Sequence, residues 1–248
     1  MFLLHGVGGG HAAWAASQAV LAAQAYRVVA WDMPGYGASA MAEPYTNAAL
    51  TEALHALVAH IGAARNVLVG HSMGGMVAQE AIALRPSAID GLVLLATSPA
   101  FGTPGGDWQQ QFLHNRFAPL DAGLGMQHLA ATLVGGMFAH STDSTGSTGQ
   151  LLATELMAQV PEATYRAALR AIVSFDQRAN LAHIKVPTLC VAAEHDGNAP
   201  PAVMQKMAAA ISQAHYTCLA GCGHLANMEQ PAAFNAVLLA YLQQHFAH

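Results

Sequence analysis

The feature that most constrains the fold is a regular alternation of short apolar runs with longer segments of helical periodicity. Continuous apolar runs are typical of strands buried on both faces, and a helix between successive strands predicts a parallel sheet. We therefore expect an α/β fold with a mostly parallel, doubly wound sheet. The expected strands are Phe2–Leu4, Tyr26–Asp32, Asn66–Gly70, Asp90–Ala96, Val186–Ala193 and His215–Ala220, and the expected helices are Ala12–Gln24, Thr46–Ile61, Met73–Leu84, Pro201–Ser212 and Pro231–Phe246.

The alternation stops in residues 98–180, where the pattern is helical and no convincing strand occurs. This segment leaves from the carboxyl end of an expected strand, so we expect it to fold over that sheet edge as a lid. The predicted organisation is an α/β core of residues 1–97 and 181–248 with a helical cap of residues 98–180. The cap helices are expected at Trp108–Arg116, Ala122–Met137, Gln150–Gln159 and Pro161–Ser174. The polar run Ser141–Gly149 should be the most mobile part of the cap, since it has almost nothing apolar to bury.

Composition limits the kinds of partner. The 248 residues are 54% hydrophobic and only 9% charged, with a net charge of −5. Nucleic-acid binding needs clustered Lys and Arg, which are absent here, so we expect none. No apolar run reaches the roughly 18 residues of a membrane span, and no basic segment of a signal peptide precedes the first apolar run. We therefore expect a cytoplasmic protein that does not bind membranes.

Cysteine and histidine usage gives little support for a metal. Cys190, Cys218 and Cys222 form no CxxC pair, which favours three reduced thiols over a disulfide framework or a zinc site. None of the 14 histidines lies in an HExxH pattern. We expect no metal and no cofactor.

One serine lies where a strand is expected to turn sharply into a helix. In "NVLVGHSMGGMVAQEAIAL", Ser72 is flanked two positions away by Gly70 and Gly74. A Gly-x-Ser-x-Gly turn between a strand and a helix places the hydroxyl above the sheet edge, and the glycines let neighbouring chains approach closely. The positive end of the helix that begins at Met73 points at the same place. This context predicts a nucleophile at Ser72.

A serine nucleophile needs a base, and the base needs an orienting acid. For this motif both are expected downstream, the acid first. Asp196 follows the expected strand Val186–Ala193, and His224 follows the next expected strand. Both side chains should therefore emerge at the same sheet edge as Ser72. Glu194 is a rival for the acid.

The glycine-rich turn "HGVGGGH" follows the first expected strand. A dinucleotide fingerprint fails here, because His11 stands where the third glycine would be required. The turn is better explained as an oxyanion hole, in which the backbone N–H groups of Val7 and Met73 converge on the developing oxyanion.

These motifs together resemble the α/β-hydrolase superfamily over nearly the whole chain. "WDMPGYGAS" resembles the family's Asp-x-Pro-Gly-x-Gly-x-Ser turn, and "HLANMEQPAAFN" is similar to the tail of 3-oxoadipate enol-lactonases and related carboxylesterases. The resemblance implies a capped serine hydrolase with Ser72 as nucleophile, Asp196 as acid and His224 as base. The two strands that usually precede the His-Gly turn in the family are missing, so we expect either that the sheet is short at that edge or that the chain has been cut there.

The leading hypothesis is a cofactor-free hydrolase of a small ester or lactone that acts through an acyl-enzyme. A C–C bond hydrolase or lyase with the same triad is an alternative, since "GCGH" also occurs in C–C bond hydrolases. A non-catalytic ligand receptor on this fold is the alternative from another class. The sequence leaves open whether the protein forms a homodimer.

The cap supplies candidates for the substrate pocket. We expect Trp108, Phe112, Met137 and Phe138 to bind substrate, although each could instead belong to the helical core of the cap. Phe101, Phe117 and Met126 are further candidates. The cap has more carboxylates than arginines, which gives no general support for a polyanionic substrate, but one well-placed arginine could bind a carboxylate.

Overall fold

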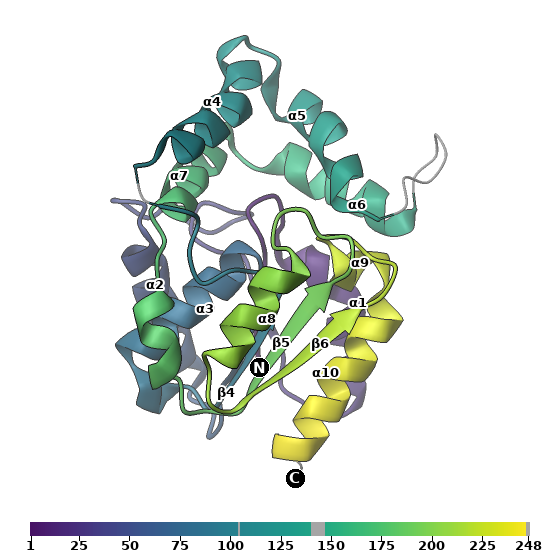
Figure 1. The fold of residues 1–248 in the computed structure, drawn as a ribbon. Coiled ribbons are helices and arrows are strands. Elements are labelled where there is room, and N and C mark those ends of the chain that lie inside the picture. Colours follow the sequence, from purple (N-terminus) through teal and green to yellow (C-terminus); the bar gives the residue numbers. More distant parts are fainter. Residues whose placement is uncertain (104, 140–146, 247–248) are drawn as a thin grey trace.

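The computed structural model describes residues 1–103, 105–139 and 147–246. These residues form one six-stranded parallel sheet in the order β2-β1-β3-β4-β5-β6, with helices against both faces (Figure 1). The predicted α/β class and doubly wound sheet are therefore confirmed. The strands are β1 (Phe2–Leu4), β2 (Val29–Trp31), β3 (Val67–His71), β4 (Gly91–Leu95), β5 (Thr188–Ala193) and β6 (Ala214–Leu219).

The second strand is shorter than the predicted Tyr26–Asp32. It lies at the sheet edge and pairs only with β1, from Phe2 opposite Val29 to Leu4 opposite Trp31. Because β1 has three residues, only three residues of β2 find backbone partners.

The core helices follow the predicted order, with small differences at their ends. The predicted helix Ala12–Gln24 begins with a 3₁₀ turn, whose Trp14 is buried against Phe234 at a ring-centroid distance of 5.9 Å. The helix predicted to reach Ser212 ends at Ala209. The core helices are α1 (Ala15–Ala23), α2 (Asn47–Ile61), α3 (Met73–Leu84), α8 (Pro201–Ala209), α9 (Ala226–Glu229) and α10 (Pro231–Phe246), with 3₁₀ turns η1 (His11–Trp14), η2 (Pro86–Ala88) and η4 (Arg178–His183).

Alternate side chains of the central strands enter two apolar clusters, one on each face of the sheet. In β4, Leu92 and Leu94 pack in the cluster to which α2, α3 and α8 contribute, whereas Val93 and Leu95 pack in the cluster of α1 and α10. Burial on both faces explains why these strands are continuous apolar runs in the sequence.

The direction of strand addition reverses at β1, which pairs with β2 on one side and β3 on the other. In open α/β sheets, ligands bind at the carboxyl ends of the strands next to such a reversal. The loops after β1 and β3 are the "HGVGGG" and "GHSMGG" turns, so the topology brings both to one place.

The helices between β4 and β5 form a separate layer beyond the carboxyl ends of the strands (Figure 1). This helical layer consists of α4 (Asp107–Asp121), α5 (Gly125–Leu133), α6 (Thr148–Gln159) and α7 (Glu162–Val173), together with the 3₁₀ turn η3 (Val134–Met137). Among the described residues, no helix is long and apolar enough to cross a membrane.

The predicted mobile run Ser141–Gly149 falls mostly on residues 140–146, which lie outside the described part of the chain. Its last two residues, Thr148 and Gly149, begin α6. The Ser147 hydroxyl caps α6 by accepting from the N–H of Gln150 at 3.2 Å. Gly149 lies so close to the Met228 carbonyl that an added Cβ would be 2.3 Å from its oxygen, so α6 packs directly on α9.

Gly74 permits the closest approach in the core. A Cβ added at this position would lie 2.2 Å from the carbonyl oxygen of Leu4, and one added at Gly70 would lie 2.4 Å from the carbonyl oxygen of Gly74. The first turn of α3 therefore packs backbone to backbone against the end of β1, which only glycine allows.

Substitution of Gly74 by Ala should destabilise the fold, because the neighbouring atoms are backbone and cannot rotate away. We expect the free energy of unfolding in urea to fall by about 1–3 kcal/mol or more. Gly136→Ala is the matched control, since an added Cβ there meets nothing within 4 Å. Equal unfolding midpoints for the two variants would contradict the close-packing argument.

Two buried histidines lie at the carboxyl ends of neighbouring strands. His5 follows β1 and is 1% exposed, and His71 ends β3 and is 4% exposed. Burial lowers the pKa of His5 to about 4 and, with the nearby His224 ring adding to it, lowers the pKa of His71 to about 3. Both rings are therefore neutral at neutral pH.

These lowered pKa values predict acid sensitivity. Below about pH 6.5 the unfolded chain binds protons at these histidines, whereas the folded chain does not. The free energy of unfolding therefore decreases as the pH is lowered, by about 1.4 kcal/mol per pH unit for each histidine. The test is the slope of the free energy of unfolding against pH, measured in urea between pH 6.5 and 4.5. In His71→Gln this slope should be smaller than in the wild type by the contribution of about one proton. The exposed His128, changed to Gln, should leave the slope as it is. Parallel slopes for wild type and His71→Gln would refute this origin.

Candidate active site

Ser72 occupies the tight turn between β3 and α3. Its backbone has φ 52° and ψ −117°, a left-handed conformation that residues with a side chain rarely adopt. The turn is held by the end of β4, where the Leu95 carbonyl accepts from the N–H of Ser72 at 3.0 Å. The Thr97 hydroxyl donates to the Ser72 carbonyl at 2.7 Å. Strain of this kind, fixed by surrounding bonds, is typical of a functional serine.

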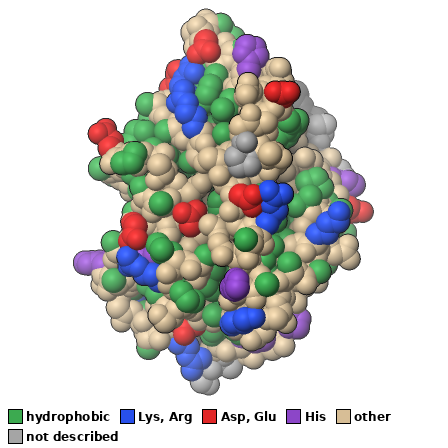
Figure 2. Space-filling model, turned by 60° about the vertical axis from the view of Figure 1, so that its left-hand side comes forward, with side chains coloured by type: hydrophobic (Ala, Val, Ile, Leu, Met, Phe, Trp, Pro, Cys, Tyr) green, Lys and Arg blue, Asp and Glu red, His purple; other side chains and the backbone are tan. Residues whose placement is uncertain are grey.

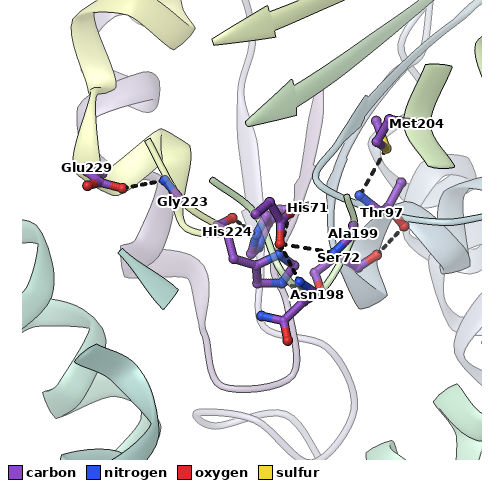
Figure 3. Close-up of polar contacts among 10 residues, drawn as sticks. His71, Ser72, Thr97, Asn198, Ala199, Met204, Gly223, His224 and Glu229 are labelled. Atoms are coloured by element: carbon purple, nitrogen blue, oxygen red, sulfur yellow. Dashed lines mark hydrogen bonds and ion pairs between the residues drawn. The ribbon is translucent and has the colours of Figure 1, made fainter. Parts of the chain in front are cut away.

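His224 lies beside Ser72 and joins it to Asp196. The His224 Nε2 atom is 3.0 Å from the Ser72 Oγ, and its Nδ1 atom is 2.8 Å from Asp196 Oδ2. Figure 3 shows the imidazole of His224 beside the Ser72 side chain. An ionised carboxylate can only accept, so Nδ1 carries the proton and Nε2 offers its lone pair to the serine hydroxyl.

Asp196 is held in the turn that follows β5. Its side chain is fully buried, and Oδ1 accepts from the N–H groups of Asn198 at 2.7 Å and Ala199 at 3.0 Å. Burial alone would raise the pKa of Asp196, but the hydrogen bond and charge of His224 and these two N–H groups outweigh it and hold the pKa below its usual range. The carboxylate is therefore ionised where it faces the imidazole.

The rival acid, Glu194, lies elsewhere. Its carboxylate accepts from the N–H of Gly221 at 2.8 Å and lies 3.7 Å from the ring of His195. Its side chain is 52% exposed. The structure thus places Asp196, and not Glu194, next to His224.

His71 connects the strand that bears Ser72 to the loop that bears His224. Its Nε2 atom donates to the His224 carbonyl at 2.9 Å, and the two rings lie 4.9 Å apart. No sequence motif assigned a role to this residue. Its position directly before Ser72, at the end of an expected buried strand, is the sequence feature that could have indicated a place in the site.

Glu229 is a second residue to which no sequence motif points. Its carboxylate accepts from the N–H of Gly223 at 2.7 Å (Figure 3) and from the N–H of Ala139 at 3.0 Å. Gly223 precedes His224, and Ala139 follows η3 of the helical layer. One carboxylate therefore ties the His224 loop to the helical layer. Glu229 lies 90 positions from Ala139 in the chain and 6 positions from Gly223.

Val7 and Met73 lie on the two loops that meet at Ser72. The Val7 carbonyl accepts from the Tyr36 hydroxyl at 2.9 Å, which holds the loop after β1. Met73 is the first residue of α3, and N–H groups in the first turn of a helix have no partner within that helix. The close packing at Gly74 brings these two loops together.

Two cavities share Ser72 and His224. The larger, of about 220 Å³, extends under the helical layer, and the smaller, of about 50 Å³, has a mostly apolar lining that includes Trp14 and Leu225. The Ser72 hydroxyl is thus accessible from a space large enough for a small organic molecule.

The predicted substrate-binding residues divide into two groups. Trp108, Phe112 and Met137 line the larger cavity, and Trp108 is 60% exposed. Phe138 is buried in the hydrophobic core and does not line that cavity. Phe101 also lines the larger cavity, where it contacts the ring of Phe112 at a centroid distance of 4.9 Å.

Charged groups are few and dispersed. Figure 2 shows Lys, Arg, Asp and Glu side chains scattered over one face and no broad basic patch on it. Within residues 1–103, 105–139 and 147–246, no group of three His, Cys, Asp or Glu side chains is placed to hold a metal ion.

Similar proteins are known by sequence and by structure. RutD of Cronobacter turicensis, named provisionally as a carbamate hydrolase, is 28% identical over 98% of this chain and 90% of its own length. The pimeloyl-[acyl-carrier protein] methyl ester esterase of Nitrosospira multiformis is 26% identical over 97% and 93%. The enol-lactonase of Burkholderia xenovorans LB400 superposes with a TM-score of 0.87 at 26% identity, over 98% and 90% of the two chains.

The family described as "alpha/beta hydrolase fold" matches residues 1–231. The matched region contains the whole sheet, the helical layer and the loops after β3, β5 and β6. Relatives with hydrolase, esterase and lactonase names support an enzyme that catalyses hydrolysis. With its strand order, its serine turn and this match, the chain belongs to the alpha/beta hydrolase fold family, as the sequence motifs predict.

Proposed function

We propose that the chain is a serine hydrolase of small carboxylic esters or lactones that acts through Ser72, His224 and Asp196. The supporting observation is the continuous line of hydrogen bonds from the Ser72 hydroxyl through the imidazole to the buried carboxylate, with distances of 3.0 and 2.8 Å. A nucleophile, a base and an orienting acid within this reach satisfy the geometric test for nucleophilic catalysis.

The proposed reaction uses these groups in sequence. The Ser72 Oγ attacks the carbonyl carbon as His224 Nε2 takes the hydroxyl proton. The imidazolium, stabilised by Asp196, then gives this proton to the leaving oxygen as the carbon–oxygen bond breaks. Water attacks the acyl-enzyme with His224 again as base, which releases the acid and restores Ser72. No cofactor is needed for any of these steps.

Two further roles belong to the proposal. The N–H groups of Val7 and Met73 stabilise the oxyanion, and a donor of this kind contributes about 3 kcal/mol to transition-state stabilisation. Residues 98–180 form a cap on a core of residues 1–97 and 181–248, and the cap shapes the larger cavity and limits the entry of water. Support for the cap comes from the helical layer that lies over the serine turn (Figure 1).

The proposal of an ester or lactone substrate is supported by similar proteins that are named as a methyl ester esterase and an enol-lactonase. A C–C bond hydrolase or lyase would use the same three side chains. A panel of p-nitrophenyl esters, lactones and vinylogous diketones separates these reactions. Labelling of Ser72 by a fluorophosphonate separates all of them from a non-catalytic receptor, which would not be labelled.

Replacement of the nucleophile gives the first test of the mechanism. Ser72→Ala should lower kcat for p-nitrophenyl acetate by at least about 10³-fold, because no other group can form the acyl-enzyme. The Ala variant should keep its circular dichroism spectrum and unfolding midpoint, since it loses one hydroxyl. Ser87→Ala, at an exposed serine of η2, is the control and should retain full activity. A Ser72→Ala enzyme with near-normal turnover would exclude Ser72 as nucleophile.

Replacement of the acid tests the choice between the two carboxylates. Asp196→Asn should lower kcat by about 10⁴-fold, because an amide no longer holds the imidazole in the tautomer that accepts the serine proton. Glu194→Gln alters an exposed carboxylate that does not contact His224 and should keep wild-type kcat. The reverse order of damage would show that Glu194 is the acid.

A further inference from the structure

The larger cavity beside Ser72 contains an unusual charge. Arg116, on α4, is half-buried and lines the cavity together with Phe112 and Tyr165. Among the described residues of this lining, Arg116 carries the one permanent charge, and none is Asp or Glu. The cavity therefore has a cationic side chain in otherwise mostly apolar surroundings.

Arg116 has no anionic partner within the described part of the protein. Its guanidinium lies over the ring of Phe112, 5.3 Å from the centroid, and no hydrogen bond or ion pair joins it to another described residue. By contrast, Arg166 of the same layer pairs with Asp121 at 2.7 Å and with Glu162 at 2.8 Å. A half-buried cation without a counter-charge is costly, so the geometry leaves its N–H donors available to a ligand.

Tyr165 provides a second donor in the same cavity. It is 2% exposed, and its hydroxyl has no hydrogen-bond partner among the described residues. Burial raises the pKa of Tyr165 to about 12, although the nearby Arg116 charge opposes this shift. The phenol therefore keeps its proton at neutral pH and can donate it in a hydrogen bond next to the guanidinium.

We propose that Arg116, assisted by Tyr165, binds a free carboxylate at the end of the substrate remote from the scissile carbonyl. The substrate class is then a small ester or lactone that carries one additional carboxylate. A guanidinium is suited to this group because its planar N–H fork matches both carboxylate oxygens. A single cation argues for one negative charge on the ligand, and the net charge of −5 disfavours polyanions. This inference rests on the proposed ester hydrolysis at Ser72.

Matched substrate pairs test the inference. Monomethyl adipate and the acetate ester of 6-hydroxyhexanoate place a carboxylate on the acyl side and on the alcohol side of the ester, respectively. Methyl hexanoate and hexyl acetate are their neutral counterparts. In the wild type, kcat/KM should be at least about tenfold higher for the acid than for the neutral ester in one of these pairs, as expected when a charge-assisted hydrogen bond is gained.

The ratio of acid to neutral kcat/KM is then measured in variants. In Arg116→Met the ratio should fall to near one, mainly through KM for the acid, and Arg116→Lys should restore part of it. A partly unfolded variant lowers both rates equally, so the ratio reports recognition and not folding. Arg170→Met is the matched control, since Arg170 also lies over an aromatic ring of this layer, 5.1 Å from the Phe117 centroid, but does not line the cavity. It should leave the ratio unchanged.

The possible outcomes separate the two proposals. A wild-type enzyme that shows no acid preference in either pair, or an Arg116→Met variant that keeps the preference, overturns the carboxylate site. If Ser72 is labelled by a fluorophosphonate and the neutral esters are hydrolysed in that case, the proposed hydrolase function stands and only the role of Arg116 fails. An absence of both labelling and hydrolysis means that the proposed function itself has failed.

Discussion

The position of Ser72 depends on one backbone contact, the packing of Gly74 against the carbonyl group of Leu4. This contact sets how closely the first turn of α3 approaches the loop after β1, and therefore how near Met73 lies to Val7. The strained backbone of Ser72 follows from the same arrangement, since the chain must leave β3 and enter α3 within a single residue. A larger residue at position 74 would separate the sheet edge from the helix that the proposed chemistry needs beside it.

The electrostatics of the site depend on the turn after β5. A buried carboxylate is stable only when hydrogen bonds replace its lost hydration. Asp196 receives such bonds from two backbone N–H groups and from the imidazole of His224. The backbone bonds fix one carboxylate oxygen and leave the other for His224, so the orientation of the ring follows from the shape of the turn. Glu194 lies only two positions earlier, yet its side chain is half exposed and its carboxylate accepts from the N–H of Gly221 instead of contacting His224.

Much of the fold could be predicted, because its determinants are local. Periodicity placed every strand to within a few residues, and the glycine turn around Ser72 indicated the strand–helix junction. The order of Asp196 and His224 along the chain then predicted that they meet. What escaped prediction depends on contacts between distant segments. Glu229 joins two loops that no local pattern connects, and the burial of Phe138 depends on how the helical layer packs against the sheet. The lack of an anionic partner for Arg116 among the described residues is likewise a property of its surroundings, which the sequence does not display.

The bond network of Glu229 bears on how the base beside Ser72 is held. Ala139 shares the carboxylate that also holds Gly223, the residue before His224, so the helical layer and the loop that bears the imidazole are held by one side chain. The larger cavity is lined by the exposed Trp108 of α4, and Glu229 is not among its lining residues. Arg116 and its aromatic neighbours therefore share one cavity with Ser72, so a substitution in α4 can change which molecules bind there without changing the groups proposed to break the bond.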